Sequence, residues 1–242
     1  MSDFVHLHLH TEYSLLDGAT RIDQLFKACK EKGMDSVAIT DHGNMFGTLY
    51  FAECAKKAYL KALEAGQTEE DATLTPIIGC ELYVCDDYKS KEEREYDHLI
   101  LLCKNKKGYK NLIKMVSTAY VDGFYYKPRI DYNYLKEHTE GLVCLSACLQ
   151  GRVSKRLVRY DYEGAKEAAL MLKDMFKDGF YIEIQDHGLE DQKRINPLLI
   201  KLADEIGVEM VATNDVHYIE REDSEVQDVI ACISTKSTID DP

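Results

Sequence analysis

The stretch FVHLHLHTEYSLLDG, residues 4–18, alternates three histidines with apolar residues and ends in an aspartate and a glycine. Successive side chains of a strand point to opposite faces, so His6, His8 and His10 are predicted to share one face. Imidazoles two residues apart at the end of a strand can hold one metal ion through their neutral nitrogens. An expression tag is the alternative, but tags are usually uninterrupted histidine runs and this one is woven into an apolar pattern. The motif alone leaves a metal site and a chance polar face equally open.

Short apolar runs of the strand type recur along the rest of the chain, and helical patterns lie between them. The apolar runs lie at 4–9, 36–40, 76–84, 98–103, 141–146, 180–184 and 208–213. The helical patterns begin at residue 22 and end at the glycine at 33, then follow at 46–65, 107–121, 163–177 and 192–206. About seven strands separated by helices predict a parallel sheet or an α/β barrel.

Residues of metal-binding type close, open or interrupt these apolar runs. A charge at the end of an apolar strand is costly unless it is paired, and a single case is commonly a satisfied buried group. Five or six in register predict one shared site at the carboxyl ends of the strands. The residues are His8, His10, Asp41, His42, Glu81, His98, Cys148, Asp215 and His217.

The composition limits the class of protein. A chain of 242 residues suits one large domain or two small ones. The net charge of −13 argues against a surface that holds nucleic acid by its overall field, and it allows an acidic pocket that holds cations. No apolar run is long enough to span a bilayer and no leader pattern precedes residue 4, while the eight cysteines lack a compact disulfide spacing. We therefore expect a cytoplasmic protein with reduced thiols and no membrane partner.

The motifs resemble the PHP (polymerase and histidinol phosphatase) domain, in the form that begins the alpha subunit of bacterial replicative DNA polymerase III. The resemblance rests on FVHLHLHTEYSLLDG, TDHGNMFG (40–47), PIIGCELYV (76–84), FYYKPRID (124–131), EIQDHG (183–188) and ATNDVHY (212–218). These motifs occur in the family's order across the chain. The resemblance implies an α/β fold, a distorted seven-stranded (β/α)7 barrel. It also implies that residues 1–242 are a single domain, the fragment of a longer polymerase subunit whose final residues lead toward polymerase domains.

The resemblance further implies three divalent metal ions held by nine side chains, with His6 left outside the cluster. The implied ligands are His8, His10, Asp17, His42, Glu81, His98, Cys148, Asp215 and His217. Imidazole and thiolate suit zinc and iron, carboxylate also admits manganese, and magnesium prefers sites made only of oxygen. Catalysis is expected from the bridging carboxylates and from one histidine that acts as a ligand or an acid. These catalytic candidates are Asp17, Glu81, Asp215 and His217.

The activity that the resemblance implies is hydrolysis of the phosphodiester at the 3′ end of DNA, a 3′–5′ exonuclease that serves proofreading. The parent subunit would carry DNA-directed DNA polymerase activity, and its partners would be the other polymerase domains and the replisome subunits. Arg129, Arg152 and His187 are candidate substrate contacts. For these residues a solvated helix face, packing against a neighbouring domain and an ordinary loop position stay open.

Three other classes of function compete with this reading. A catalytically silent domain would use its metals as structural staples or bind a partner. A phosphatase of the histidinol-phosphatase type would act on small phosphomonoesters. An amidohydrolase also begins with HxH on a first strand, but it usually lacks the additional glutamate, cysteine and D-x-H pair.

Overall fold

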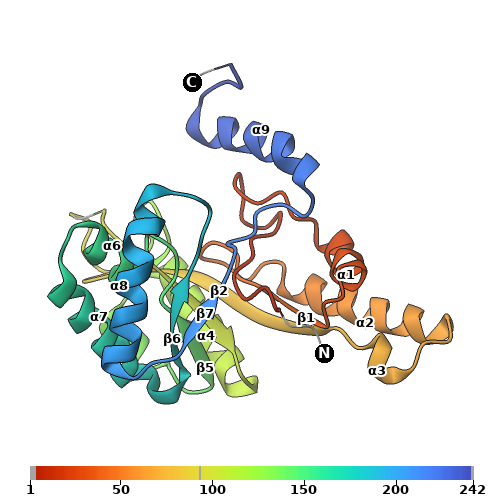
Figure 1. The fold of residues 1–242 in the computed structure, drawn as a ribbon, viewed down its shortest axis with the longest axis horizontal. Coiled ribbons are helices and arrows are strands. Elements are labelled where there is room, and N and C mark those ends of the chain that lie inside the picture. Colours follow the sequence, from red (N-terminus) through yellow and green to blue (C-terminus); the bar gives the residue numbers. More distant parts are fainter. Residues whose placement is uncertain (1–3, 93, 241–242) are drawn as a thin grey trace. The chain divides into compact units, whose positions relative to one another are not determined.

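The computed structural model describes residues 4–92 and 94–240 (Figure 1). The chain forms two compact units. Unit 1 is built from the chain up to Ile78 and from Asp215 onward, and unit 2 is the intervening segment, Gly79–Asn214. Unit 2 is therefore an insertion into the sequence of unit 1, and the chain passes between the units twice.

The helices and strands follow one another along both units. Unit 1 contains α1 (Ile22–Glu31), β1 (Ser36–Ile39), α2 (Thr48–Glu64), α3 (Glu69–Ala72), a short 3-10 helix η2 (Arg221–Asp223) and α9 (Ser224–Thr235). Strand β2 (Thr75–Cys85) runs from unit 1 into unit 2. Unit 2 contains β3 (Asp97–Cys103), α4 (Lys106–Val121), β4 (Arg129–Asp131), α5 (Tyr132–Lys136), β5 (Leu142–Leu145), α6 (Arg152–Val158), α7 (Tyr162–Phe176), η1 (Lys177–Gly179), β6 (Phe180–Ile184), α8 (Glu190–Ile206) and β7 (Met210–Ala212).

The core of unit 1 lies between α1, α2 and β1. Ile22 and Phe26 on the apolar face of α1 are buried, and the Phe26 ring stacks on Phe51 of α2 with centroids 5.0 Å apart. Val37 on β1 is fully buried in the same cluster. Burying a side chain of this size stabilises the fold by about 2 kcal/mol. Gly33 ends the helical region as predicted, with a φ of 72° that glycine adopts without strain.

The first predicted strand is extended but does not form a regular ladder. His6 bridges Val37 of β1, and Leu9 bridges Val216, both in the parallel sense. A bend at His8 separates the two bridges. The segment thus has β1 on one side and the chain after β7 on the other, which is the pairing expected of the first strand of a barrel. The predicted position of this strand agrees with these pairings. The segment forms isolated bridges, however, and not the regular strand that the alternation predicts.

The sheet of unit 2 is mixed. Strand β5 pairs with β6, β6 with β7 and β2 with β4 in parallel, whereas β3 is antiparallel to both β2 and β5. The prediction of a parallel sheet is wrong for β3. No helix lies between β2 and β3 among the described residues 86–92 and 94–96, and a connection without a crossover element returns the chain in the antiparallel sense.

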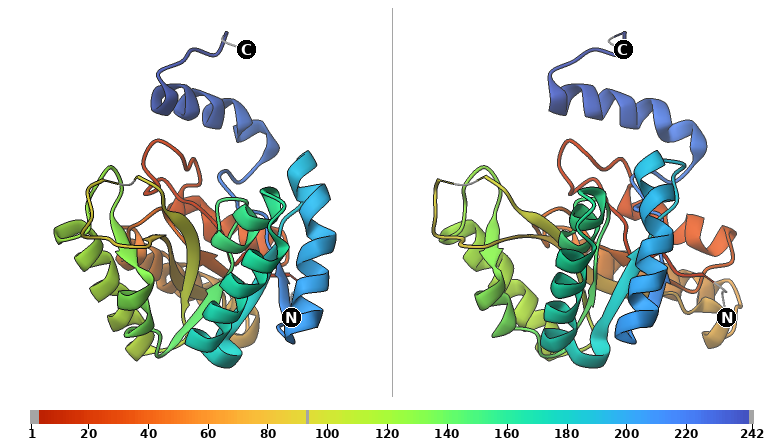
Figure 2. Two further views of the ribbon diagram at one scale, coloured as in Figure 1. Left: turned by 90° about the vertical axis from the view of Figure 1, so that its left-hand side faces the viewer. Right: turned by 60° about the vertical axis from the view of Figure 1, so that its left-hand side comes forward.

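Helices cover the sheet of unit 2 (Figure 2). Helix α7 packs against α6, α8 and β5, and α8 packs against β6. The predicted helices at 46–65, 107–121, 163–177 and 192–206 are confirmed by α2, α4, α7 and α8, with ends within two residues. The polar stretch after residue 65 forms the short helix α3, because the Thr68 hydroxyl accepts a hydrogen bond from the backbone N–H of Asp71.

The predicted α/β class with seven strands is confirmed, and the strand pairings agree with a distorted (β/α)7 barrel of the PHP type. The strand that sequence patterns missed is β4, three residues inside the FYYKPRID motif. None of the helices in the described part of the chain has the length and apolar character needed to cross a bilayer.

Candidate metal centre

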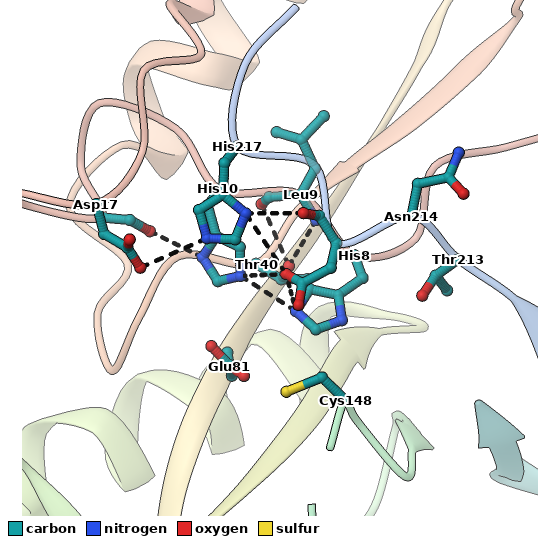
Figure 3. A network of polar contacts seen from close by, with 12 residues as sticks. His8, Leu9, His10, Asp17, Thr40, Glu81, Cys148, Thr213, Asn214 and His217 are labelled. Carbon is teal, nitrogen blue, oxygen red and sulfur yellow. Dashed lines mark hydrogen bonds and ion pairs between the residues drawn. The ribbon is translucent and has the colours of Figure 1, made fainter. Parts of the chain in front are cut away.

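Three donor atoms in unit 1 lie at the mutual distances of ligands of a single ion (Figure 3). His8 Nε2 lies 3.1 Å from His10 Nε2 and 3.1 Å from Asp215 Oδ1, and His10 Nε2 lies 3.2 Å from the same oxygen. For metal–nitrogen distances near 2.0–2.1 Å, tetrahedral ligand atoms are separated by about 3.3 Å. Both histidines are fully buried. This group therefore fits a transition-metal ion such as zinc.

A second group in unit 1 shares His10 with the first. The His42 and His217 rings pack against the His10 ring, with ring centroids 4.1 Å and 4.5 Å from that of His10. Each of the three residues can offer one ligand atom, and these atoms lie within 4.8 Å of one another. Asp17 joins them, because its Oδ2 lies 2.5 Å from His42 Nε2 and 3.4 Å from His217 Nε2. The six predicted ligands of unit 1 thus come together from three segments of the sequence.

The charges of this second group are strongly coupled. Burial opposes ionisation of Asp17, but hydrogen bonds with His217 and His42 outweigh it and hold the pKa of Asp17 well below its usual range. Burial also lowers the pKa of His217, yet the hydrogen bond with Asp17 and the charge of Asp215 leave that pKa above its usual value. A metal ion that binds these side chains replaces the protons that they share, so its affinity falls at low pH.

The backbone around Asp215 directs the ring of His217. Asp215 has a positive φ of 47°, a left-handed conformation that costs a non-glycine residue about 1–2 kcal/mol. The Asp215 carbonyl oxygen then lies 2.7 Å from His217 Nδ1 and accepts a hydrogen bond from it. With the proton on Nδ1, the lone pair of the neutral ring is at Nε2, the atom that faces Asp17.

Unit 2 assembles the other three predicted ligands. Glu81 on β2 and His98 on β3 lie on one face of the sheet, because Glu81 pairs with Ile100, two residues beyond His98. Glu81 Oε1 is in close contact with His98 Nδ1, and the Cys148 sulfur lies 3.8 Å from the same nitrogen. The loop that carries Cys148 is tied to β3, since the His98 backbone N–H donates to the Gln150 carbonyl oxygen. An imidazole, a carboxylate and a thiol make a donor set that suits zinc or iron.

The three candidate substrate residues all lie in unit 2, and each has partners there. Arg129 is 1% exposed and donates to the Ser90 carbonyl oxygen. Arg152 pairs with Asp86 at 2.8 Å, and its guanidinium lies over the Tyr132 ring. His187 is exposed, and its Nε2 lies 2.8 Å from the Asn214 carbonyl oxygen. Their contact with a substrate stays a prediction, and for Arg129 it needs a rearrangement of a buried side chain.

The sequence did not point to Ser14, and it grouped Asp41 with the candidate ligands. Asp41 is buried and accepts hydrogen bonds from the Thr11 and Ser14 hydroxyls, so it supports the ligands rather than joining any of the three donor groups found in the described residues. Serine and threonine are common in turns, and no sequence signal distinguishes a turn serine from one that contacts a residue 27 positions away.

The sequence is similar to known proteins over most of its length. Residues 6–187 match the family model of the PHP domain. The chain is 45% identical over 245 residues to DNA polymerase III subunit alpha of Treponema pallidum (strain Nichols), covering 99% of this chain and 20% of that protein. It is 41% identical over 247 residues to the same subunit of Thermus aquaticus, covering 99% and 19%. The chain therefore spans about a fifth of the length of these relatives.

Solved structures with lower similarity were also found. A putative metal-dependent phosphoesterase from Bifidobacterium adolescentis matches with a TM-score of 0.45 and 16% identity, over 88% of this chain and 87% of that one. Histidinol phosphate phosphatase from Lactococcus lactis, complexed with zinc, L-histidinol and phosphate, matches with a TM-score of 0.39 and 11% identity, over 97% and 94%.

Proposed function

The chain belongs to the PHP domain family, which has a metal-dependent phosphoesterase fold, and on that premise we propose that it hydrolyses the phosphodiester at the 3′ end of DNA. The single observation that carries the proposal is the donor set. All nine positions that the resemblance implies carry a metal-binding side chain, and these side chains gather within their own units at ligand-like distances. The proposed cofactors are three divalent cations of zinc, manganese or iron.

The charge of the donor set favours a phosphate substrate. Three carboxylates and one thiolate bring about four negative charges, against about six positive charges from three divalent cations. When bound, the cations supply Lewis-acid activation of water and neutralise charge on phosphate oxygens. We assign Asp17, Glu81 and Asp215 to holding the cations. His217 Nε2 faces Asp17, and the raised pKa of His217 favours a proton on this atom when no cation is bound.

The wider context is proposed from the relatives. DNA polymerase III subunit alpha is the name of proteins about five times longer than this chain. We propose that this segment is the PHP domain of such a subunit and that its exonuclease activity serves proofreading. The polymerase activity, the replisome partners and the contact with a DNA 3′ end are proposed for the whole protein.

The test combines metal content with DNA digestion. Purified protein is analysed for bound metals and then incubated with a 3′-labelled primer strand in Mn²⁺, Zn²⁺ or chelator. We expect bound transition metal and release of labelled mononucleotide that the chelator abolishes. Asp215→Asn removes a donor oxygen and is expected to reduce both bound metal and release to background. Glu222→Gln, an exposed carboxylate in η2, is the matched control and is expected to behave as the parent protein.

Three outcomes contradict the proposal or one of its residue assignments. Release of inorganic phosphate from histidinol phosphate, with no shortening of DNA under any cation, assigns the site to small phosphomonoesters. Bound metal with no hydrolysis of either substrate, and loss of folding on chelation, assigns the metals to a structural role. If the Asp215→Asn protein retains full DNA cleavage, Asp215 is not part of the catalytic metal centre.

A further inference from the structure

Ser14 makes hydrogen bonds with three of the predicted ligand residues and with Asp41. Its hydroxyl oxygen lies 3.0 Å from His10 Nδ1, 3.1 Å from the backbone nitrogen of His42 and 2.7 Å from Asp41 Oδ1. Its carbonyl oxygen accepts a hydrogen bond from the backbone N–H of Asp17 at 3.0 Å. Ser14 is fully buried, so solvent does not compete for these bonds.

The hydroxyl of a serine has one proton to donate and two lone pairs to accept with. The backbone N–H of His42 only donates, so it occupies one lone pair. Asp41 Oδ1 already accepts from the backbone N–H of Thr11 at 2.7 Å, which marks this oxygen as an acceptor. The Ser14 proton therefore goes to Asp41. The remaining lone pair of Ser14 then accepts from His10, and His10 must carry its proton on Nδ1.

This assignment places the lone pair of the neutral His10 ring at Nε2. That is the atom 3.1 Å from His8 Nε2 and 3.2 Å from Asp215 Oδ1, where a ligand must present a lone pair. We propose that Ser14 and Asp41 are positioning residues that fix the tautomer and the orientation of His10 for metal binding. The tautomer is a property of the metal-free protein, and its consequence for metal affinity rests on the proposed function.

The reverse arrangement has a defined chemical requirement. For Ser14 to donate to His10 Nδ1, Asp41 must itself be protonated and donate to Ser14. The proton would have to sit on Asp41 Oδ1, the oxygen that already accepts from the Thr11 backbone N–H at 2.7 Å. A proton on Asp41 Oδ2 would leave Oδ1 as an acceptor for the Ser14 hydroxyl.

The direct test is the tautomer of His10 in metal-free protein. Long-range ¹H–¹⁵N correlation spectra of protein with ¹⁵N-labelled histidine, recorded near pH 8, distinguish the two neutral forms of the ring. The His10 signals are identified by their absence from His10→Asn protein. We expect His10 in the Nδ1–H form. A predominant Nε2–H form in the parent protein overturns the proposal without the need for any Ser14 variant.

The second test follows the consequence of removing the hydroxyl. Ser14→Ala is expected to shift His10 toward the Nε2–H form and to weaken zinc binding about 10- to 100-fold, measured by competition with a chelator. Ser14→Thr keeps a hydroxyl and is expected to recover part of that loss. Ser36→Ala is the control, because Ser36 also bonds a carboxylate of unit 1, Asp35, at 3.0 Å.

The outcomes separate this inference from the proposed function. Ser14→Ala protein that folds and keeps both the His10 tautomer and the zinc affinity overturns the positioning role. Parent protein that binds no zinc overturns the proposed metal site, and the His10 spectrum still decides whether Ser14 sets the tautomer. A loss of affinity in Ser36→Ala equal to that in Ser14→Ala assigns the effect to general destabilisation and also counts against the proposal.

Discussion

Gly18 directly follows the ligand Asp17, and its missing side chain makes room for the backbone of the ligand loop. A Cβ at this position would lie 2.1 Å from the Thr11 carbonyl oxygen, far inside contact distance. We predict that Gly18→Ala lowers the free energy of unfolding by about 2 kcal/mol, in the range of overpacking substitutions. It should also weaken metal binding, because the chain must move away from Thr11 and carry Asp17 with it. Thermal unfolding and zinc titration measure the two effects.

Gly33 provides the contrast for this prediction. A Cβ there meets nothing within 4 Å, but its φ of 72° makes any other residue strained. Gly33→Ala is therefore expected to cost about 1 kcal/mol of stability and to leave metal affinity unchanged. Equal metal affinities for both variants and the parent protein would show that the Gly18 contact does not hold Asp17 in place.

At this scale the sequence predicted the donors but not the groups that support them. His8 and His10 were evident because they alternate with apolar residues, and Glu81 because it interrupts an apolar run. Ser14 was not evident, because its role depends on contacts that only folding brings together. Arg129 looked available in a polar motif, yet it is buried within unit 2. A sequence shows which side chains have the right chemistry and leaves open what their neighbours are.

Helix α7 begins at a carboxylate whose pKa is shifted, and this gives a prediction for pH. The Asp161 side chain accepts hydrogen bonds from the backbone N–H of Gly164 at 2.9 Å and from Arg156 at 3.0 Å. These bonds hold the pKa of Asp161 below its usual value. The folded pKa is below the unfolded one, so Asp161 contributes stability above about pH 4, and this contribution is lost as the pH falls through the folded pKa.

The variant Asp161→Asn keeps an acceptor for the helix cap but removes the charge. We predict that it is less stable than the parent protein at pH 7 and that the difference narrows toward pH 3. Urea unfolding across this range measures the effect. Asp178→Asn, an exposed carboxylate in η1, serves as the control. A difference that is constant with pH would show that the Asp161 charge makes no contribution to the cap.

Helices were predicted more accurately than strands, and the reason is physical. A helix such as α8 buries Ile195, Leu199 and Leu202 with a period that the sequence displays by itself. The direction of β3 depends on the connection that precedes it, and β4 has three residues, too few to show alternation. The segment at 4–10 has a strand pattern, but it bends at His8, between two isolated bridges to different partners. Periodicity describes single elements and leaves their pairing undetermined.

For the molecule as a whole, metal removal is expected to loosen the first segment selectively. Residues 4–18 contribute three predicted ligands and pair with neighbouring strands through isolated bridges rather than a regular ladder. A ligand present at a thousand times its dissociation constant stabilises the folded state by about 4 kcal/mol. We predict that a chelator lowers the melting temperature and speeds amide hydrogen exchange in residues 4–18. Helix α8, which carries no predicted ligand, serves as the internal reference. Unchanged exchange at 4–18 after complete metal loss would contradict the prediction.

The amino-acid composition does not indicate where the chain passes from one unit to the other. No glycine- or proline-rich linker marks either passage, since one of them lies inside the continuous strand β2 and the other between Asn214 and Asp215 in a ligand motif. The expectation that residues 1–242 form a single domain stays a prediction. Boundaries that run through strands and motifs are invisible to any search for linkers.

The insertion of unit 2 within unit 1 has a consequence for biosynthesis. All residues of unit 2 leave the ribosome as one uninterrupted stretch, so this unit can fold while translation continues. His8 and His10 emerge first, but Asp215 and His217 are added more than two hundred codons later. The donor groups of unit 1 can therefore form only after the whole of unit 2 has been synthesised.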